Sequence, residues 1–512
     1  MINLIAFREV EHTEFENGEN IELGSLMAFL KQHGFTAQYI YLDRNHMMGS
    51  TETFSDINVI NVYNTTIDHA FSLISKVKKK FPQSVFFLFS RFATEASELI
   101  LEEYAGIDGV ILGHPEYPLL TFLNCIRDGK SICQAVSEND HIMSSYSKEG
   151  KYAKDIDINL LPVPDRSMLM ENKATIAYLN TSYGCAGKCS FCGLFYRDKW
   201  TGRGAMDIFC EIISIYNKTG IRIFIFDDAS FEDMGEDGKK KLFELCRLLI
   251  DYPVKFSFRC FMRTESFKET EEDIRLLEKL KKAGFVNILW GIEAGNETDL
   301  RLYQKRATVA DNERIQRLLA QTGHDFLYGF IMMNPYSTVE TLTSNVEYLY
   351  KIKCTHLEYY ISAVRLWYGT ALYQKLKCDE LLIDEKDYKN YYNYHYVDKE
   401  VEAISNFMFQ EFNFHNVLME ADYEEYHFEQ FFRYLKHLFG KEVAFYEKEL
   451  KHIQKKLLEE MYGFFAPVYR ELDLEFAKEH VEDLKKNLEE LYLEIKHLKL
   501  KVIKFYTRKQ VK

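Results

Sequence analysis

The chain has 512 residues, of which 47% are hydrophobic and 28% charged, and its formal net charge at pH 7 is −14. This length exceeds a single hydrophobic core, so we expect two or three domains in a globular protein. No apolar run approaches the roughly 18 residues of a membrane span, and the negative charge argues against a large sequence-independent nucleic-acid surface.

Residues 1–140 alternate short apolar strands with helices. Strands are expected at Ile2–Phe7, Ala37–Leu42, Ile57–Val62, Val85–Phe89 and Gly109–Leu112, and helices at Leu23–His33, Ile67–Lys80 and Glu95–Tyr104. This alternation predicts an α/β domain built on a doubly wound parallel sheet. The first strand lacks the basic segment that precedes a signal-peptide core, so we expect a cytoplasmic protein with reduced thiols.

Residues 141–173 form the predicted linker between domains. They contain the segment Leu160-Leu-Pro-Val-Pro-Asp-Arg166, whose two prolines favour extended backbone. After the linker, a strand is expected at Ile176–Asn180, and this strand leads directly into the most informative motif of the chain.

Cys185, Cys189 and Cys192 stand in the run Tyr183-Gly-Cys-Ala-Gly-Lys-Cys-Ser-Phe-Cys-Gly193. Three thiolates at C-x3-C-x2-C spacing on a glycine-containing loop suit three irons of a [4Fe–4S] cluster. The fourth iron is then left without a protein ligand, and an open coordination position is where metal chemistry takes place. We therefore predict an open [4Fe–4S] cluster on this loop.

A structural zinc site is the main alternative, because zinc is also held by thiolates. Zinc normally needs a fourth Cys or His close by. Cys210 is the nearest downstream cysteine and falls in a predicted helix, and no histidine occurs between Lys173 and Ile250. A disulfide framework is not expected from ten cysteines in a chain of this length, and chance clustering would not explain the glycines.

Residues 174–390 repeat strand and helix with a longer period. Further strands are expected at Ile223–Asp227, Val254–Arg259, Val286–Gly291, Phe326–Met332 and His356–Ile361, with helices at Asp207–Thr219, Lys239–Ile250, Glu271–Ala283, Asp311–Gln321 and Val339–Lys351. Six β-α units predict a partial (β/α)6 barrel of the TIM type, whose active groups lie at the C-terminal ends of strands. The cysteines, Asp227, Asp228, Arg259 and Glu293 all lie at such ends.

Residues 391–512 are rich in Glu, Lys, Leu, Tyr and Phe and should form a helical C-terminal domain. From Leu474 to Val502, apolar residues alternate spacings of three and four, which predicts a long packed helix. This helix either lies over the barrel or forms the seam of a homodimer. The aromatic run Tyr391-Tyr-Asn-Tyr-His-Tyr396 is expected to pack in the interior, with a substrate pocket as the alternative.

The cysteine loop, the predicted barrel and the domain before it together resemble the radical S-adenosylmethionine (SAM) superfamily. More narrowly, residues 1–390 look like the branch with an N-terminal cobalamin-binding-type domain. That branch includes class B radical SAM methyltransferases and the anaerobic magnesium-protoporphyrin cyclase. Besides the cysteines, the resemblance is carried by Leu161-Pro-Val-Pro-Asp-Arg166, Phe226-Asp-Asp-Ala-Ser-Phe231 and Gly291-Ile-Glu-Ala-Gly295.

The resemblance implies a cluster whose unique iron is chelated by the amino and carboxylate groups of SAM. The reduced cluster passes one electron into the sulfonium, and the resulting 5′-deoxyadenosyl radical takes hydrogen from an unactivated C–H bond. A low-potential donor such as flavodoxin or ferredoxin is the expected electron source. The part of the protein is to hold SAM and to exclude water and side reactions.

By position, the resemblance assigns one of the aspartate pair 227–228 to the SAM ammonium, because a carboxylate pairs with a cation. Arg259 suits the SAM carboxylate, Glu293 suits the ribose or the amino group, and the main chain near Phe191 would contact adenine. Arg203, just after the cluster loop, is a further candidate. The alternative for each charged residue is an ordinary salt bridge at the rim of the barrel.

Two segments of the N-terminal domain depart from the cobalamin-binding pattern. Where that pattern has D-x-H-x-x-G after the first strand, this chain has Val10-Glu-His-Thr-Glu-Phe15. After the fourth strand a Gly-Gly pair usually lets the nucleotide tail of the corrin approach the backbone, and Ser90-Arg-Phe-Ala-Thr94 is expected to crowd that space. In contrast, Gly113-His-Pro-Glu116 resembles the usual Gly-Glu signature. Cobalamin is expected, with a domain that has lost the corrin as the alternative.

Three functions are compatible with these motifs. The leading hypothesis is a cobalamin-dependent radical SAM methyltransferase that acts on an unactivated carbon of a peptide or small metabolite. The second is a cobalamin-free radical SAM enzyme that carries out a rearrangement, cross-link or oxidation. The third is a non-catalytic scaffold that binds partners through the C-terminal helices. No recognition motif in the sequence identifies the substrate.

Overall fold

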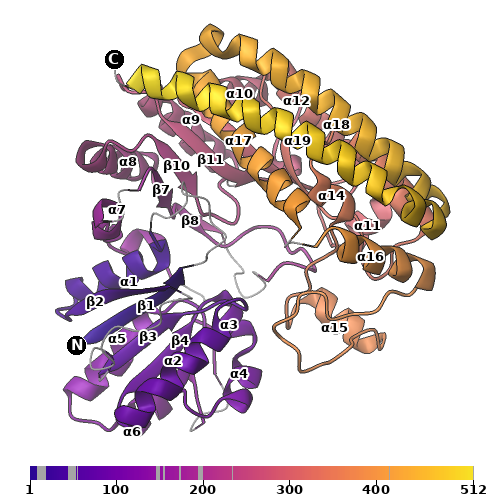
Figure 1. Ribbon diagram of the computed structural model, residues 1–512. Helices are drawn as coiled ribbons and strands as arrows, with labels where there is room; N and C mark the ends of the chain where they lie inside the picture. Colours follow the sequence, from indigo (N-terminus) through magenta and orange to yellow (C-terminus); the bar gives the residue numbers. More distant parts are fainter. Residues whose placement is uncertain are drawn as a thin grey trace. The chain divides into compact units, whose positions relative to one another are not determined.

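The structure is a computed structural model that describes residues 1–8, 19–43, 54, 56–145, 150–153, 156–171, 174–193, 200–232, 235–413 and 416–510 (Figure 1). Its internal contacts divide the chain into two compact units. The first unit comprises residues 1–233, 366–374 and 385–391, and the second comprises residues 234–365, 375–384 and 392–512.

The first unit contains a six-stranded sheet in the order β2-β1-β3-β4-β5-β6. Its strands are β1 (Ile2–Arg8), β2 (Ala37–Asp43), β3 (Ile57–Asn61), β4 (Val85–Phe89), β5 (Gly109–Ile111) and β6 (Ile142–Met143). Neighbouring strands are parallel except β5 and β6, which are antiparallel. The predicted parallel sheet is therefore confirmed, and its first five strands differ from their predicted bounds by at most one residue.

Helices cover both faces of this sheet, as expected for strands that are apolar on both sides (Figure 1). The helices are α1 (Ile21–Gln32), α2 (Ile67–Lys80), α3 (Arg91–Glu95), α4 (Ser97–Glu103), α5 (Glu116–Arg127) and α6 (Ile132–Ser137). Phe86 and Leu88 pack with α2, α3 and α4, while Phe87 and Phe89 pack with α1, α5 and α6. The single helix predicted at 95–104 is wrong in detail. The helical segment is interrupted at Ala96, so that α3 ends at Glu95 and α4 begins at Ser97.

The rest of the first unit begins within the predicted linker, which contains η2 and α7. It contains η2 (Ile158–Leu160), α7 (Ser167–Glu171), β7 (Ile176–Leu179), β8 (Ser182–Tyr183), β9 (Thr201–Gly202), α8 (Ala205–Thr219) and β10 (Ile223–Phe226). β7 and β10 are parallel neighbours, and β8 pairs with β9 as a short antiparallel ribbon. This ribbon brackets the cysteine loop.

The second unit begins with three parallel strands and the helices between them. The elements are α9 (Glu236–Asp251), β11 (Ser257–Met262), η3 (Thr264–Ser266), α10 (Glu271–Ala283), β12 (Phe285–Glu293), α11 (Glu297–Leu302), α12 (Val309–Thr322), β13 (Leu327–Phe330) and α13 (Val339–Lys351). β12 lies between β11 and β13 and is parallel to both. The α/β alternation predicted for this part of the chain is confirmed.

The sixth predicted strand, His356–Ile361, is wrong: this segment forms the short helix α14 (Leu357–Ile361). The carboxylate of Asp422 accepts hydrogen bonds from the amides of Leu357 (2.8 Å) and Glu358 (3.1 Å), so it caps the start of the helix. Strand-like pairing occurs just after the helix, where Ala363 forms an isolated parallel bridge with Met333. A carboxylate from a distant helix therefore overrides the strand preference of an aromatic segment.

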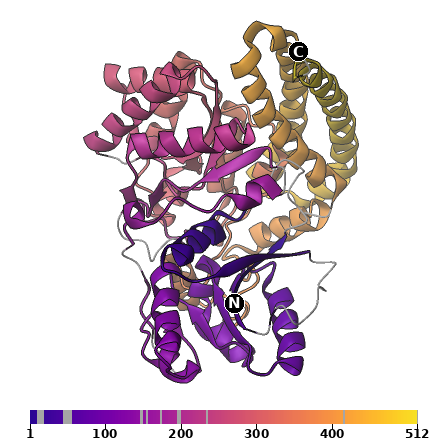
Figure 2. The same cartoon turned by 90° about the vertical axis from the view of Figure 1, so that its left-hand side faces the viewer.

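The remaining helices are α15 (Ala371–Cys378), α16 (Lys399–Glu411), α17 (Val417–Phe439), η4 (Gly440–Val443), α18 (Ala444–Glu471) and α19 (Leu474–Gln510). α17, α18 and α19 pack side by side (Figures 1 and 2). The apolar stripe of α19 is buried within the chain at Ala477, Val481, Leu484, Leu488, Leu491, Ile495, Leu498 and Val502. The predicted long packed helix is confirmed, and its stripe is covered by helices of the same chain.

The aromatic run after residue 390 packs in the interior, as expected. Tyr394 and Tyr396 are each 5% exposed, and their hydroxyls are bonded to the Val364 carbonyl and to Ser405, both at 2.8 Å. Within the described residues, no helix combines the length and the apolar character that crossing a membrane requires.

Candidate functional site

The three cysteines lie on one short loop that follows β8 in the first unit, and each is partly buried. Gly184 opens the loop with φ +82°, a left-handed conformation that glycine adopts without strain. The Gly187 amide donates to Cys185 Sγ at 3.3 Å, and the Cys192 amide donates to the Cys189 carbonyl at 3.1 Å. Amides directed at sulfur are a usual surrounding of iron–sulfur clusters, so this donor set fits the predicted [4Fe–4S] group.

Asp228 holds the segment that leads into this loop. Its carboxylate, in a residue only 2% exposed, accepts hydrogen bonds from the amides of Thr181 and Ser182, both at 2.7 Å, and from the Thr181 hydroxyl at 2.5 Å. Three donors to one buried carboxylate fix the turn between β7 and β8. The Asp228 carboxylate is therefore buried and held by groups of the protein.

Asp227, the other member of the predicted pair, is exposed at the C-terminal end of β10. Its amide donates to the Leu179 carbonyl at 2.9 Å and so extends the pairing of β7 with β10. Of the two aspartates, Asp227 is therefore the one whose side chain is accessible to a ligand. The assignment of a SAM contact to it stays a prediction.

Arg203 is part of a buried ion network. Its Nη1 contacts the Glu211 carboxylate and donates to the Asn180 carbonyl at 3.3 Å. Arg166, from the proline-containing linker, pairs with the same Glu211 and with Glu19 at 2.5 Å. Burial raises the pKa of Glu211, but the two arginines outweigh it and hold that pKa below its usual value. This network ties the linker to β7 and α8, while the predicted SAM contact of Arg203 stays a prediction.

The segment after β5 of the six-stranded sheet adjoins the cysteine loop within the first unit. The ring of His114, which is 8% exposed, packs at a tilt against Tyr183, just before the first cysteine, with ring centroids 4.4 Å apart. Gly113 has φ +87°, and its amide donates to the Thr94 hydroxyl at 3.0 Å. The Gly-Glu signature therefore lies beside the candidate cluster loop, as a cofactor shared by the two would require.

The segment after β4 also reaches this loop, which the sequence did not reveal. A Cβ added at Gly193 would lie 2.6 Å from Oε1 of Glu95 and 3.1 Å from Nε of Arg91. The Arg91 guanidinium stands over the ring of Trp367, 4.4 Å from its centroid. The sequence did not single out Arg91 or Trp367, so they become candidates only because Arg91 lies beside Gly193 and Trp367 packs against Arg91.

The segment after β4 forms the start of α3. Ser90 caps this helix by accepting from the Ala93 amide at 3.0 Å, and Phe92, Ala93 and Thr94 are buried, the first two in the core that packs on the sheet. The predicted crowding of a nucleotide tail by this segment stays a prediction. The other departure, at residues 10–15, lies outside the described residues.

The second unit holds the remaining predicted site residues. Glu293 ends β12 with φ +65°, which is uncommon for a residue other than glycine and recurs at functional sites. Its Oε1 lies 3.3 Å from Nζ of the buried Lys305, and its carbonyl accepts the Ile331 amide at 2.9 Å. Arg259 is partly buried on β11, with its guanidinium 5.8 Å from the centroid of the Phe261 ring.

The structure therefore divides the predicted site residues between its two units. The first unit holds Cys185, Cys189, Cys192, Phe191, Arg203, Asp227 and Asp228, and the second holds Arg259 and Glu293. Phe191 is partly buried between two of the cysteines. The roles of Phe191, Arg259 and Glu293 toward SAM stay predictions.

No protein-family model matches the chain. The chain is 28% identical over 265 residues to the anaerobic magnesium-protoporphyrin IX monomethyl ester cyclase of Cereibacter sphaeroides. This match covers 49% of the present chain and 42% of the relative, so the chain spans less than half of that enzyme.

Two solved structures share the fold. The cobalamin-dependent SAM radical enzyme OxsB, solved with aqua-cobalamin and SAM bound, matches all of this chain and 81% of its own length with a TM-score of 0.72 and 16% identity. The radical SAM methyltransferase TsrM from Kitasatospora setae, solved with cobalamin and a [4Fe–4S] cluster, matches 74% of this chain and 75% of its own length with a TM-score of 0.58 and 14% identity. The relative and both structures come from the branch that the motifs indicated, so the predicted resemblance is confirmed.

Proposed function

We propose that the chain is a radical SAM enzyme in which Cys185, Cys189 and Cys192 bind three irons of a [4Fe–4S] cluster and SAM binds the fourth. The observation that carries this proposal is the cysteine loop itself, with three partly buried thiols and the Gly187 amide directed at a sulfur. When bound, the reduced cluster supplies the electron that cleaves SAM to a 5′-deoxyadenosyl radical. The similarity to enzymes of the same branch supports the proposal.

The residues around the loop position it and shield it from water. Asp228 keeps the preceding turn in place, and Asp227 presents a carboxylate that suits the SAM ammonium. We assign Arg259 to the SAM carboxylate and Glu293 to the ribose or the amino group. The main chain at Phe191 is assigned to adenine.

Anaerobic reconstitution tests this proposal. We expect about four irons and four sulfides per chain, visible charge-transfer absorption, and release of 5′-deoxyadenosine when dithionite and SAM are added. Cys185→Ala, Cys189→Ala and Cys192→Ala should each lose these properties. Cys210→Ala is the matched control, because Cys210 is exposed on α8 and should leave the cluster unchanged. A cluster that survives the loss of any of the three cysteines would contradict the proposal.

The finer proposal is cobalamin-dependent methyl transfer to an unactivated carbon of a small metabolite or peptide. The contact of His114 with Tyr183 supports it, because it brings the sheet edge that would hold a corrin next to the cluster loop. Ser90-Arg-Phe-Ala-Thr94 stands where a Gly-Gly pair usually lets the nucleotide tail approach, so we derive no step through cobalamin. Cobalt in the purified protein and S-adenosylhomocysteine among the products would support methyl transfer.

A cobalamin-free radical SAM reaction is the second candidate, and the segment after β4 motivates it. Ser90-Arg-Phe-Ala-Thr94 replaces the usual Gly-Gly pair, and Phe92, Ala93 and Thr94 are buried. This candidate predicts an active preparation that contains no cobalt and forms 5′-deoxyadenosine without S-adenosylhomocysteine. A non-catalytic scaffold is not proposed, because the similar proteins are enzymes.

The first unit contains the parallel pair β7–β10, and the second contains the parallel set β11–β12–β13. A partial barrel that includes these strands, without the sixth predicted strand, stays a proposal. A flavodoxin or ferredoxin is proposed as electron donor, and the cytoplasm as location. A homodimer would have to use a face other than the apolar stripe of α19, since that stripe is covered within the chain.

A further inference from the structure

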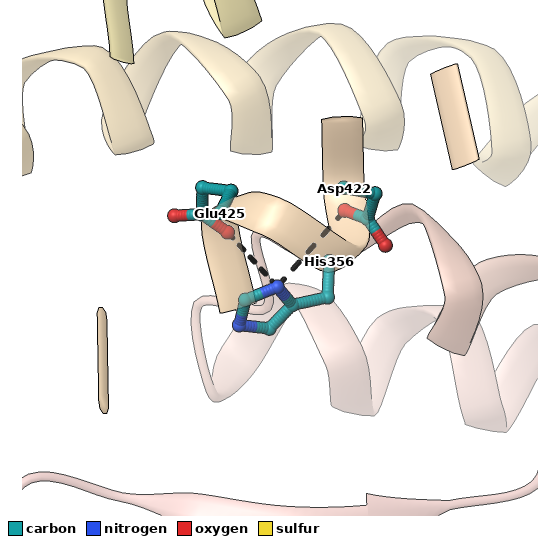
Figure 3. A group of neighbouring side chains, drawn as sticks. All are labelled: His356, Asp422 and Glu425. Carbon is teal, nitrogen blue, oxygen red and sulfur yellow. Dashed lines mark ion pairs between the residues drawn. The ribbon is translucent and has the colours of Figure 1, made fainter. Parts of the chain in front are cut away.

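A second group of metal-ligand side chains lies in the second unit, away from every residue assigned above. His356 precedes α14, and Asp422 and Glu425 lie three residues apart on α17, so the two carboxylates share one helix face (Figure 3). All three residues are buried, at 7%, 3% and 1% exposure. Burying two carboxylates and an imidazole together is costly unless something compensates for the loss of water.

The ligand atoms of these residues converge. His356 Nδ1 lies 3.0 Å from Glu425 Oε2 and 4.0 Å from Asp422 Oδ1, and one ligand atom from each residue lies within 4.8 Å of the others. A divalent cation bonded to N and O ligands at about 2.1 Å holds its ligand atoms about 3 to 4 Å apart. The separations therefore match one shared cation.

Two of the three ligand atoms form an ion pair with each other but no hydrogen bond. His356 Nδ1 and Glu425 Oε2 are 3.0 Å apart, yet neither atom has a hydrogen-bond partner of acceptable geometry among the described residues. Figure 3 shows the two atoms directed at each other and joined by the dashed line of their ion pair. A cation between them would satisfy both atoms, which a direct hydrogen bond in this arrangement does not.

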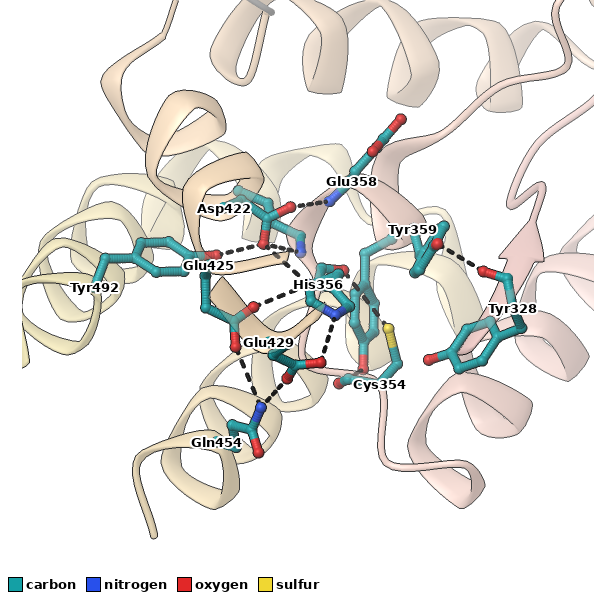
Figure 4. Close-up of polar contacts among 12 residues, drawn as sticks. Tyr328, Cys354, His356, Glu358, Tyr359, Asp422, Glu425, Glu429, Gln454 and Tyr492 are labelled. Carbon is teal, nitrogen blue, oxygen red and sulfur yellow. Dashed lines mark hydrogen bonds and ion pairs between the residues drawn. The ribbon is translucent and has the colours of Figure 1, made fainter. Parts of the chain in front are cut away.

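The residues around the group are arranged as they are around metal ligands. Glu429 Oε2 lies 3.7 Å from the other ring nitrogen of His356, and Gln454 bonds to Glu429 in turn (Figure 4). Arg433 also donates to Glu429, at 2.7 Å. A carboxylate on the far nitrogen fixes the orientation of a ligating imidazole. The Tyr492 hydroxyl donates to Asp422 at 2.8 Å and orients that carboxylate.

A cavity reaches one of the three residues, His356. It has a volume of about 810 Å³, and its lining includes His356, Glu429, Gln454, Tyr359 and Tyr426. An ion could therefore reach the imidazole without unfolding of the second unit, as a metal site requires.

We propose that His356 Nδ1, Asp422 and Glu425 bind one divalent transition-metal cation, with Glu429 as the residue that orients the imidazole. One imidazole and two carboxylates suit Mn²⁺, Fe²⁺ or Zn²⁺ better than Mg²⁺. The cation links the start of α14 to α17, although His356 and Asp422 are 66 residues apart in the sequence. This site is independent of the cysteine cluster and of the proposed function.

The test uses the full chain with Cys185, Cys189 and Cys192 replaced by Ala, so that no cluster iron is counted. We expect about one Mn²⁺ per chain in a titration followed by the loss of the free-ion EPR signal. We also expect a melting temperature that rises with Mn²⁺ concentration. His356→Gln and Glu425→Gln should abolish both effects, and Glu429→Gln should weaken binding about 10- to 100-fold. If the triple variant does not fold, the same titration of the wild-type chain gives the count.

Glu358→Gln is the matched control, because Glu358 lies on the same short helix and its carboxylate points away from the group (Figure 4). In the background of the triple cysteine variant, Glu358→Gln should bind the same amount of Mn²⁺ as the triple variant itself. If neither the triple variant nor the wild-type chain binds Mn²⁺, Fe²⁺ or Zn²⁺ in large excess, the group is a metal-free network of a protonated imidazole and carboxylates, and the proposal is overturned. Unchanged binding in His356→Gln would overturn it as well.

Discussion

Asp227 and Asp228 are neighbours at the end of β10, but their side chains differ in burial and in hydrogen bonding. Asp228 is buried and accepts three hydrogen bonds, whereas Asp227 is exposed. A sequence motif places both at the rim of a strand but does not say which one turns inward. Burial and three hydrogen bonds hold the Asp228 carboxylate in place, whereas the Asp227 side chain is exposed and its proposed contact with SAM stays a prediction.

The first prediction compares these two residues. Asp228→Asn should lower the free energy of unfolding by about 1–3 kcal/mol, because an amide cannot accept all three donors. Asp227→Asn should change it by less than about 0.5 kcal/mol, as for an exposed site, while weakening SAM binding. Urea unfolding and SAM titration of the reconstituted protein check both. Equal stability losses in the two variants would contradict the assignment.

Glu116 is the last residue of the Gly113-His-Pro-Glu116 signature, and its side chain is buried in the first unit. It is 2% exposed, and Oε1 accepts the Ser25 hydroxyl at 3.0 Å, while Oε2 has no hydrogen-bond partner among the described residues. Burial raises the pKa of Glu116 from its ordinary value of 4.5 to about 7. A buried carboxyl of this kind prefers its protonated form in the folded state.

The second prediction follows from the sign of that shift. Since the pKa is higher in the folded state, the contribution of Glu116 to stability is fully present below about pH 4.5 and is lost as the pH rises toward 7. The loss is on the order of 3 kcal/mol at 1.4 kcal/mol per pH unit. Glu116→Gln cannot ionise, so its unfolding free energy should fall less over this interval. Parallel pH profiles of the two proteins, measured by urea unfolding, would refute the prediction.

At the scale of elements, α14 shows how a distant group changes a local preference. The segment after His356 is aromatic and β-branched, which favours a strand. The Asp422 carboxylate on α17 binds its first two amides and stabilises a helix instead. The parallel pairing that was expected there is limited to Ala363, just beyond the helix.

The third prediction concerns the packing of α19. Leu488 is fully buried in the apolar stripe, and Leu493 on the same helix is 54% exposed. Leu488→Ala should lower the free energy of unfolding by about 2–5 kcal/mol, because it leaves a cavity between packed helices. Leu493→Ala should cost less than about 0.5 kcal/mol. Chemical denaturation followed by circular dichroism measures both, and similar midpoints for the two variants would contradict the packing described for α19.

At the scale of the molecule, the linker arginine joins parts of the first unit that are far apart in sequence. Arg166 contacts Glu19 before α1, the Tyr178 carbonyl on β7 and Glu211 on α8. All of these groups are buried, so removing the guanidinium would leave a carboxylate without its counter-charge.

The fourth prediction is that Arg166→Ala destabilises the first unit by about 3–5 kcal/mol. The control is Lys31→Ala, which removes an ion pair of 2.7 Å with Asp165, the residue next to Arg166 in sequence. Lys31 is 53% exposed, so this pair should contribute at most about 1 kcal/mol. Limited proteolysis and urea unfolding distinguish the two variants, and comparable effects would exclude the structural role of the arginine.

Local patterns were sufficient to predict much of the chain. The alternation of short apolar runs and amphipathic segments predicted the parallel sheet of the first unit and most helices of the second, because such periodicities arise from burial of one or both faces of an element. The spacing of Cys185, Cys189 and Cys192 predicted a common loop, since three ligands within eight residues must lie close together. The heptad spacing of α19 predicted its long packed helix for the same kind of local reason.

Only the tertiary structure decided which charged residues face inward and which distant side chains meet. The inward turn of Asp228, the contacts of Arg91 and Trp367 beside the cysteine loop, and the helix at α14 depend on groups that are remote in sequence. The same holds for His356 and the carboxylates of α17, which belong to no motif. The spacing of residues along a chain predicts helical or strand periodicity and short loops. Contacts between residues far apart in sequence depend on how whole elements pack, and a local pattern does not predict them.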